Sequence, residues 1–418
     1  MHLPTTTRYP RQRSVALAML GATALLLASL SGARVMAAGE ASPAGTVTDG
    51  DMTTDLAVSW VGQATSFTGR GDDAYAIGYL VLDGDVVTES SLLAEGDGSV
   101  SDLELDITAE GEGFSAVIAR GEDTDVTLTG SIVATDDGDG SNASDFSGLG
   151  ALIVASDGAT VTVDSMDLTT EGFVRAAFIA DDQADIIVTD STVTTLGADP
   201  LVDIYTDYEN NADTARMISP PWVLGIQGGV RAGNMLGQQP SLSVVDSDVT
   251  SGSWAVLSTD SSSQPQMTVV DSALTILTEA EGGMTSGDFP YSDDYGSGYG
   301  TYLIGNANQD FYGVTFEGMT YAAIFAGGEA TYSSSSGSID LLDGEGNVLD
   351  TVEGDGDPTV IDVVWGFMSH GNADLDVLDG TQVNAEEAIF LYKGGSTDIE
   401  FDEAVLDSAS GIILQMID

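Results

Sequence analysis

The chain of 418 residues contains no cysteine, which excludes disulfide bonds, thiolate metal sites, a cysteine nucleophile and a lipid anchor on cysteine. The fold must therefore be held by packing and hydrogen bonds alone. Basic residues are also scarce, since ten Lys and Arg stand against 67 Asp and Glu, for a formal net charge of -57. Such a surface repels nucleic acid and anionic lipid headgroups, and it attracts cations or basic partners.

Two interpretations of this acid excess stay open. Acid-rich surfaces suit salty surroundings, because the Debye length falls to about 3 Å at 1 M salt and self-repulsion is then screened. The alternative is a dedicated cation-binding role. Disorder is not expected, because hydrophobic residues make up 42% of the chain.

Acids are absent from the first 37 residues, where four of the ten bases lie: Arg8, Arg11, Arg13 and Arg34. The stretch 14–32 is almost wholly apolar or small, and Val35-Met36-Ala37 presents a cleavage pattern to a signal peptidase. The pattern predicts a signal peptide at 1–37, with an uncleaved anchor as the alternative. We expect a product that is secreted, extracellular, on the cell surface or in the periplasm, without membrane insertion after cleavage.

Short alternating strands recur along the rest of the chain, many of them in pairs joined by Asp-Ser. β-branched residues alternate with polar ones, as expected where one face of a strand is buried. Asp and Ser side chains bend a chain by bonding to nearby backbone groups. Examples are 160–170 (TVTVDSMDLTT), 185–195 (DIIVTDSTVTT), 241–250 (SLSVVDSDVT) and 266–275 (QMTVVDSALT).

An apolar run follows each strand pair and ends in a small or polar turn. Examples are 116–119 (AVIA), 151–155 (ALIVA), 177–180 (AFIA), 255–258 (AVLS) and 323–326 (AIFA). One such unit cannot bury its apolar face alone, so we expect the units to stack in register. In that arrangement one residue of each run, Ile118, Ile153, Ile179 and Leu257, shares a single interior file.

These features predict an all-β fold: a flexible segment at 38–56, then a single-stranded right-handed parallel β-helix, or solenoid, at 57–418. The alternative is a β-sandwich, whose turns also come at short spacing, although hairpin signals of the Asn-Gly type are lacking. Strand pairs joined by Asp-Ser and alternating with apolar runs make residues 57–418 resemble bacterial right-handed parallel β-helix repeat proteins. The passenger domains of autotransporter adhesins are the nearest kind. The chain departs from the autotransporter plan because it shows no translocator barrel.

The extra residues of the long units fall in one slot, between the strand pair and the apolar run, at 136–149, 196–221, 279–300 and 333–362. A fixed slot in a solenoid maps to one edge, and loops on alternate units lie about 10 Å apart there. The slot predicts a rim of loop insertions on one edge, and such rims commonly bind partners. Protection or decoration of that edge is the alternative.

Acidic residues punctuated by glycine occur in two of these insertions. Flexible loops with many oxygen atoms suit calcium, which takes six to eight oxygen ligands, but no EF-hand spacing occurs here. Calcium is the one cofactor that the loops suggest, and a solvated loop is the alternative. The candidate metal ligands are Asp137, Asp139 and Asp145 in DDGDGSNASD, and Asp355 and Asp357 in EGDGDP.

Tyrosines gather in two other insertions: Tyr205 and Tyr208 in one, and Tyr291, Tyr295 and Tyr299 in the next. Tyrosines beside acids can stack on a sugar or meet a protein partner, so these five are the candidate binding residues of the rim. Packing of the insertions onto the flank is the alternative.

No catalytic residues can be proposed, because carboxylate pairs are too numerous to be informative and the bases are scattered. His370 is the one histidine after the leader, and its place in a turn (SHGN) predicts a solvated side chain. The sequence therefore favours an adhesin-like binding or structural protein whose partners are a cell-surface glycan or protein, and cations. The alternative is a polysaccharide-degrading enzyme, a lyase or glycoside hydrolase, on the same scaffold.

Overall fold

A computed structural model describes residues 44–49, 52–55, 65–67, 74–83, 86–90, 102–110, 114–135, 151–172, 176–197, 231–252, 254–260, 262–283, 295–296 and 298–417. By its internal contacts the chain divides after Ala37, and all of these ranges belong to the second unit, Ala38–Asp418. The predicted leader, 1–37, lies outside the described residues. Within them, no helix is long and apolar enough to cross a membrane.

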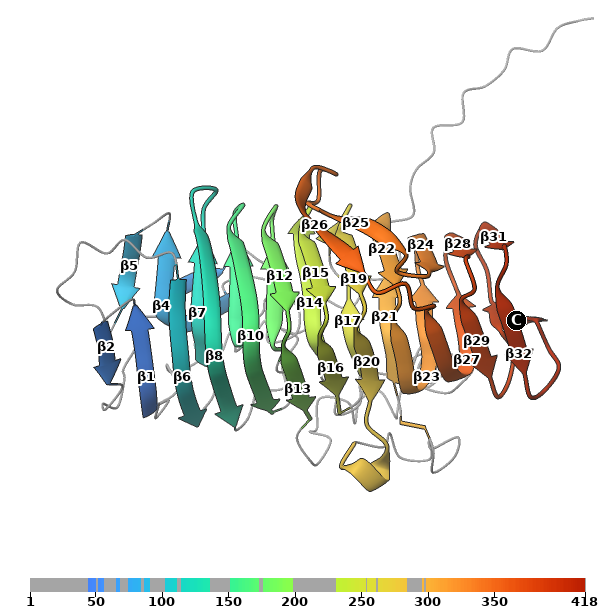
Figure 1. Cartoon of the computed structure of the whole chain (residues 1–418), viewed down its shortest axis with the longest axis horizontal. Helices are drawn as coiled ribbons and strands as arrows, with labels where there is room; N and C mark the ends of the chain where they lie inside the picture. Colours follow the sequence, from blue (N-terminus) through green and yellow to red (C-terminus); the bar gives the residue numbers. More distant parts are fainter. Residues whose placement is uncertain are drawn as a thin grey trace, which may run out of the picture. The chain divides into compact units, whose positions relative to one another are not determined.

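This unit is all-β, and its longest sheet is mostly parallel (Figure 1). One short 3-10 helix, η2 (Glu279–Glu281), lies within the described ranges. Most strands belong to three files, which we name by their position relative to the Asp-Ser corners.

The pre-corner file contains the strands that lead into the corners. They are β6 (Asp102–Glu110), β8 (Asp125–Thr135), β10 (Thr160–Glu171), β12 (Asp185–Thr189), β15 (Ser241–Val245), β19 (Gln266–Val270), β22 (Ala307–Tyr312), β24 (Gly328–Ser333), β28 (Ala373–Val377) and β31 (Thr397–Phe401).

The post-corner file contains the strands that follow. They are the second halves of β6, β8 and β10, then β13 (Thr192–Leu196), β16 (Asp248–Ser251), β20 (Ala273–Ile276), the first halves of β23 (Thr315–Phe325) and β27 (Val360–Ser369), β29 (Gln382–Ala385) and β32 (Val405–Ser408).

The run file contains the apolar runs. Its strands are β4 (Ala74–Asp83), β7 (Phe114–Arg120), β9 (Ile153–Ser156), β11 (Phe178–Asp181), β14 (Arg231–Gln238), β17 (Trp254–Ser258), β21 (Gly298–Leu303), the second halves of β23 and β27, β30 (Phe390–Tyr392) and β33 (Leu414–Met416). A two-residue strand, β18 (Ser262–Ser263), pairs with the end of β14.

Within each file, a strand pairs in parallel with its counterpart in the next repeat. In the pre-corner file, Ile186 of β12 lies opposite Leu242 of β15, which lies opposite Met267 of β19. All three side chains are buried in the main apolar cluster. The colours in Figure 1 accordingly pass in chain order from one labelled strand to its neighbour. This repeat-like pairing is compatible with a β-helix solenoid and does not fit the antiparallel sandwich.

The amino-terminal strands depart from this pattern. β1 (Ala44–Asp49) pairs antiparallel with β2 (Met52–Asp55) and with β6. β3 (Thr65–Phe67) and β5 (Val86–Ser90) also pair antiparallel, both with β4. Where the sequence predicts a flexible segment at 38–56, the structure therefore has two strands, which are rich in β-branched threonine and valine.

Both faces are buried in the middle strands of the run file, and this explains why those strands are continuously apolar. Every residue of β9, β11 and β17 is buried. One face joins the main cluster, while the other forms two further clusters, one of which stacks Tyr321 on Trp365 with ring centroids 5.3 Å apart. A strand with one wet face alternates, and a strand buried on both faces does not.

The sequence predicts a single interior file of four residues, and for two of the four this prediction is wrong by one residue. Ile153 and Leu257 belong to the main cluster, but Ile118 and Ile179 lie on the opposite face, on either side of Val154. Successive side chains of a strand point to opposite faces of the sheet, so a one-residue error in aligning apolar runs assigns a side chain to the wrong face. An unbroken run contains no polar residue that would fix the alignment.

One predicted insertion, 333–362, is described in full and is a hairpin. β25 (Gly337–Leu342) pairs antiparallel with β26 (Val348–Gly354), and the hairpin lies against the pre-corner strands (Figure 1). The insertions 136–149 and 196–221 lie almost wholly outside the described residues, and 279–300 does so in part. The hairpin lies between the pre-corner strand β24 and the post-corner half of β27, so the prediction that all four insertions share one slot is wrong for 333–362. The rim formed by the other three insertions stays a prediction.

Buried serines connect the corners of successive repeats. The hydroxyls of Ser191, Ser247 and Ser272 each donate to the carbonyl two residues earlier, at 2.7 Å. The same oxygens accept from the backbone N–H of Met166, Ser191 and Ser247, each in the preceding repeat, at 3.0 Å. The predicted bonds from corner side chains to backbone are thus present, and they also cross between repeats.

We predict that Ser247→Ala destabilises the chain by about 1–3 kcal/mol, because it leaves the buried N–H of Ser191 without its acceptor. Urea unfolding measures the change. Ser165→Ala is the matched control, since Ser165 is exposed and its hydroxyl donates to the neighbouring Asp164 carboxylate. Equal losses for the two variants would contradict a role for the serine ladder.

Candidate functional site

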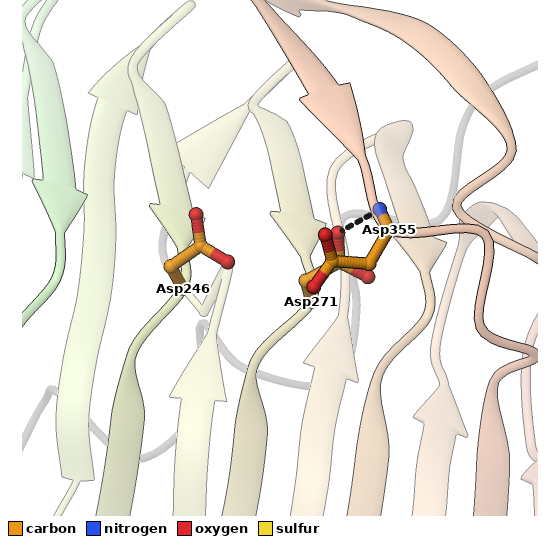
Figure 2. A group of neighbouring side chains, drawn as sticks. All are labelled: Asp246, Asp271 and Asp355. Carbon is orange, nitrogen blue, oxygen red and sulfur yellow. Dashed lines mark hydrogen bonds between the residues drawn. The ribbon is translucent and has the colours of Figure 1, made fainter.

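Corner aspartates project from the sheet next to the serine ladder. Asp190, Asp246 and Asp271 each adopt a left-handed backbone conformation, with φ of 49°, 48° and 45°. Aspartate tolerates this region better than most residues, which suits it to a sharp corner. Because β15 and β19 pair in register, Asp246 and Asp271 come from adjacent repeats and lie side by side (Figure 2).

The hairpin adds a third carboxylate. Ile339 and Leu341 of β25 pack on Val245 and Val270 of the pre-corner file, and this contact places the end of β26 over the corners. The backbone N–H of Asp355 then donates to Asp271 Oδ2 at 2.8 Å.

The three carboxylates form a compact acidic cluster, Asp246, Asp271 and Asp355, drawn in Figure 2. One oxygen from each lies within 4.8 Å of the others. Asp271 is half-buried, and its Oδ1 is a buried atom with no hydrogen-bond partner among the described residues. Two unit charges at 4.8 Å repel by about 1 kcal/mol in bulk water and by about 3.5 kcal/mol at an effective dielectric constant of about 20.

The pKa of the Asp246 carboxyl responds to this crowding. Partial burial raises it first, and the charge of Asp271 adds to the increase. Asp190 and Asp355 raise the same pKa further. The ionised form of the cluster is therefore electrostatically unfavourable in the folded chain.

A hard cation is the chemical species that such a cluster could hold. Three carboxylate oxygens supply part of the six to eight oxygens that calcium takes, and water would have to supply most of the others. Exposed acidic groups of this kind also occur without an ion, and their repulsion is then relieved by salt alone.

The sequence identified one member of the cluster, Asp355. Its predicted partner Asp357 instead uses its backbone carbonyl, which accepts from the N–H of Ser335 at 2.9 Å. Asp137, Asp139 and Asp145 lie outside the described residues. Asp246 and Asp271 were predicted only as corner residues, although stacking of the repeated Asp-Ser pairs would bring them together at the strand spacing of about 4.8 Å.

Two of the five candidate binding tyrosines are described, and both pack against the sheet. Tyr299 is 2% exposed and belongs to an outer apolar cluster. Tyr295 is partly buried against the same cluster, and its hydroxyl donates to Asp362 Oδ1 at 3.2 Å. These positions favour the packing interpretation for the pair. Tyr205, Tyr208 and Tyr291 lie outside the described residues, so their binding role stays a prediction.

The prediction of a solvated His370 is wrong. Its imidazole is half-buried and stacks on Tyr302, with Nε2 3.4 Å from the tyrosine hydroxyl. Burial, helped by the charge of Lys393, lowers the pKa of His370 to about 4, and burial raises the pKa of Tyr302 well above its ordinary value. Both shifts move the pKa away from neutral pH.

Arg231 occupies a buried site on the outer side of the run file. Its guanidinium lies 4.0 Å from the centroid of the Trp254 ring, donates to Ser258 at 2.8 Å and pairs with Asp260 at 3.3 Å. This arrangement accounts for the burial of both Arg231 and Trp254.

The chain has no match among protein-family models, curated proteins or solved structures. The geometry of its own residues is therefore the basis for a functional proposal.

A second group of acids, Asp157, Asp181 and Asp182, lies where β9 and β11 end. Asp181 is 3% exposed, and burial, then the charges of Asp182 and Asp157, raises its pKa to about 7. The turn after β11 fits closely against Gly237, where a Cβ atom would lie 2.4 Å from Asp181 Oδ1. The φ of 69° at Gly237 favours glycine, and the Asp181 and Asp182 carboxylates would have to shift to admit a Cβ atom there.

We predict that Asp181→Asn flattens the pH dependence of stability and stabilises the chain at pH 8 by up to about 4 kcal/mol. The folded-state pKa of Asp181 lies near 7 and its ordinary value is 3.8, so the folded state binds the extra proton. The parent chain should therefore lose stability as pH rises from about 4 to 7. Urea unfolding at pH 5 and pH 8 measures this, with exposed Asp123→Asn as the control. Identical pH profiles for parent and Asp181→Asn would contradict the assignment.

Proposed function

We propose that the mature chain is a right-handed parallel β-helix that is exported and acts by display, as a secreted or surface-associated, adhesin-like binding or structural protein. The observation that supports this proposal is the parallel pairing of all three strand files, repeat after repeat. Backbone hydrogen bonds and a shared apolar interior then make one stiff body, which suits the presentation of surface groups.

Chain sterics support the right-handed form of this proposal. When one parallel strand is connected to the next in the same sheet, the crossover is right-handed in about 98% of cases, because strands twist that way. Each repeat of this chain makes such a return between neighbouring strands of a file.

The described exterior is rich in acidic groups. Carboxylates line the corners and the hairpin. A shallow groove across several repeats is lined mainly by acids and amides, among them Asn306, Glu329, Asn372, Asp374 and Asp398. Such surfaces attract cations and partners with basic or hydroxyl groups.

The resemblance to autotransporter passengers enters this proposal as an analogy of architecture. Surface passengers carry their function on a β-helical rod, and the same arrangement would serve a cell-surface glycan or protein partner here. Calcium would act between this chain and its partner, or within an acidic loop, rather than as a catalytic metal.

We predict that the mature chain binds surface polysaccharide or protein of the producing cells without degrading it. Purified residues 38–418 are incubated with those cell surfaces, with pectin-like polysaccharides and with algal polysaccharides. Saturable binding with no sustained release of reducing or unsaturated ends is the expected result. Continuous release of such ends would identify a polysaccharide-degrading enzyme and overturn the proposal.

Export has its own test. Fractionation of the producing cells should place the chain outside the cytoplasm, and sequencing of its amino terminus should begin after Ala37. A cytoplasmic product that retains Met1 would contradict export while leaving the fold untouched.

A further inference from the structure

The hairpin β25–β26 carries charge of a single sign. From 337 to 357 the chain has seven acids and no base: Asp340, Asp343, Glu345, Asp350, Glu353, Asp355 and Asp357. None of these charges can therefore be neutralised from within the hairpin.

The sheet beneath the hairpin carries the same sign at both ends of the contact. At the base, Asp355 lies beside Asp246 and Asp271 in the acidic cluster. At the tip, Asp343 is close enough to Asp185 to act on it electrostatically. Like charges thus face one another across the interface in two places.

Short-range contacts oppose this repulsion. Leu341 is fully buried and Ile339 is 7% exposed, both against Val245 and Val270. The tip fits so closely that a Cβ atom on Gly344 would lie 1.9 Å from the carbonyl oxygen of Gln239. At the base, the N–H of Asp355 bonds to Asp271.

Ionic strength affects the repulsion between carboxylates and the apolar contacts of the hairpin differently. Salt shortens the Debye length from about 8 Å at 0.15 M to about 3 Å at 1 M and so weakens the repulsion between exposed carboxylates. Apolar contacts are not weakened in this way, and strongly excluded salts reinforce them. The balance between a docked and an open hairpin is therefore set by salt.

We propose that hairpin β25–β26 is a salt-controlled strap. At high ionic strength it is docked on the pre-corner strands. At low ionic strength the acidic cluster drives it open and uncovers an apolar patch formed by Val245 and Val270, with Ile187 and Tyr312 beside them.

The absence of cysteine from the chain allows a direct test. Leu341→Cys places a single thiol in the interface, where an uncharged reagent such as N-ethylmaleimide reaches it only when the hairpin opens. We expect its labelling rate to fall at least fivefold between 0.05 M and 2 M NaCl. Val270→Cys probes the same interface from the sheet side and should respond in the same way. A rate independent of salt at both positions overturns the proposal.

Two reference thiols separate local from global opening. Ala323→Cys is fully buried in the main cluster and reports opening of the whole sheet. Val348→Cys, at a position 54% exposed on the hairpin, reports the intrinsic reaction of the thiol. If Leu341→Cys and Ala323→Cys slow by the same factor, salt stabilises the entire fold and no strap exists.

A matched pair of charge variants tests the role of the cluster. Combined with Leu341→Cys, Asp355→Asn should slow labelling at 0.05 M NaCl and remove at least half of the salt effect, while it keeps the backbone bond to Asp271. Asp350→Asn removes the same charge from an exposed site in the hairpin, outside the cluster, and should retain the salt effect. Equal behaviour of the two variants would refute control by the cluster.

Discussion

Parallel backbone pairing between successive repeats, fixed in register at the corners, is the constraint on which the other features depend. The buried corner serines Ser191, Ser247 and Ser272 each satisfy a carbonyl of their own repeat and an N–H of the preceding one, so a shift of one residue would leave several buried polar groups without partners. Register then determines which side chains face the interior. It also stacks the corner aspartates that precede the serines, and so creates an acidic row without any local sequence signal.

The negative charge of the chain limits which insertions can pack against its own sheet. The chain has 67 acids and ten bases, so an acidic insertion that folds back onto the sheet faces other negative charges at most positions. The hairpin β25–β26 docks through a few apolar side chains at the point where Val245 and Val270 face outward. Its carboxylates meet those of the corners, and salt or cations set the strength of that contact. The same surface is consistent with a display function and with a salty environment, because exposed carboxylates can bind a partner or cations and also suit high salt.

The strands, their order and the buried face of the alternating segments could be predicted from the sequence, because TVTV, DIIV and SLSV alternate with period two and Asp-Ser marks many of the corners. The run file could not be aligned to the residue, since Ile118 and Ile153 lie in unbroken apolar stretches that look alike on both faces. Asp355 could be identified as a candidate ligand from its loop composition. Asp246 and Asp271 could not, because their proximity to it depends on a hairpin contact between distant segments. His370 was misassigned because a turn sequence does not show that Tyr302 covers it.

Disulfide trapping between paired strands tests the register most directly. Thr194 of β13 lies opposite Thr250 of β16, and both side chains are partly exposed, so Thr194→Cys with Thr250→Cys should form a disulfide under mild oxidation. Thr194→Cys with Asp248→Cys has the second thiol on the same face but two residues out of register, and it should stay reduced under those conditions. Rapid crosslinking of the second pair, with none in the first, would contradict the stacking on which the account rests.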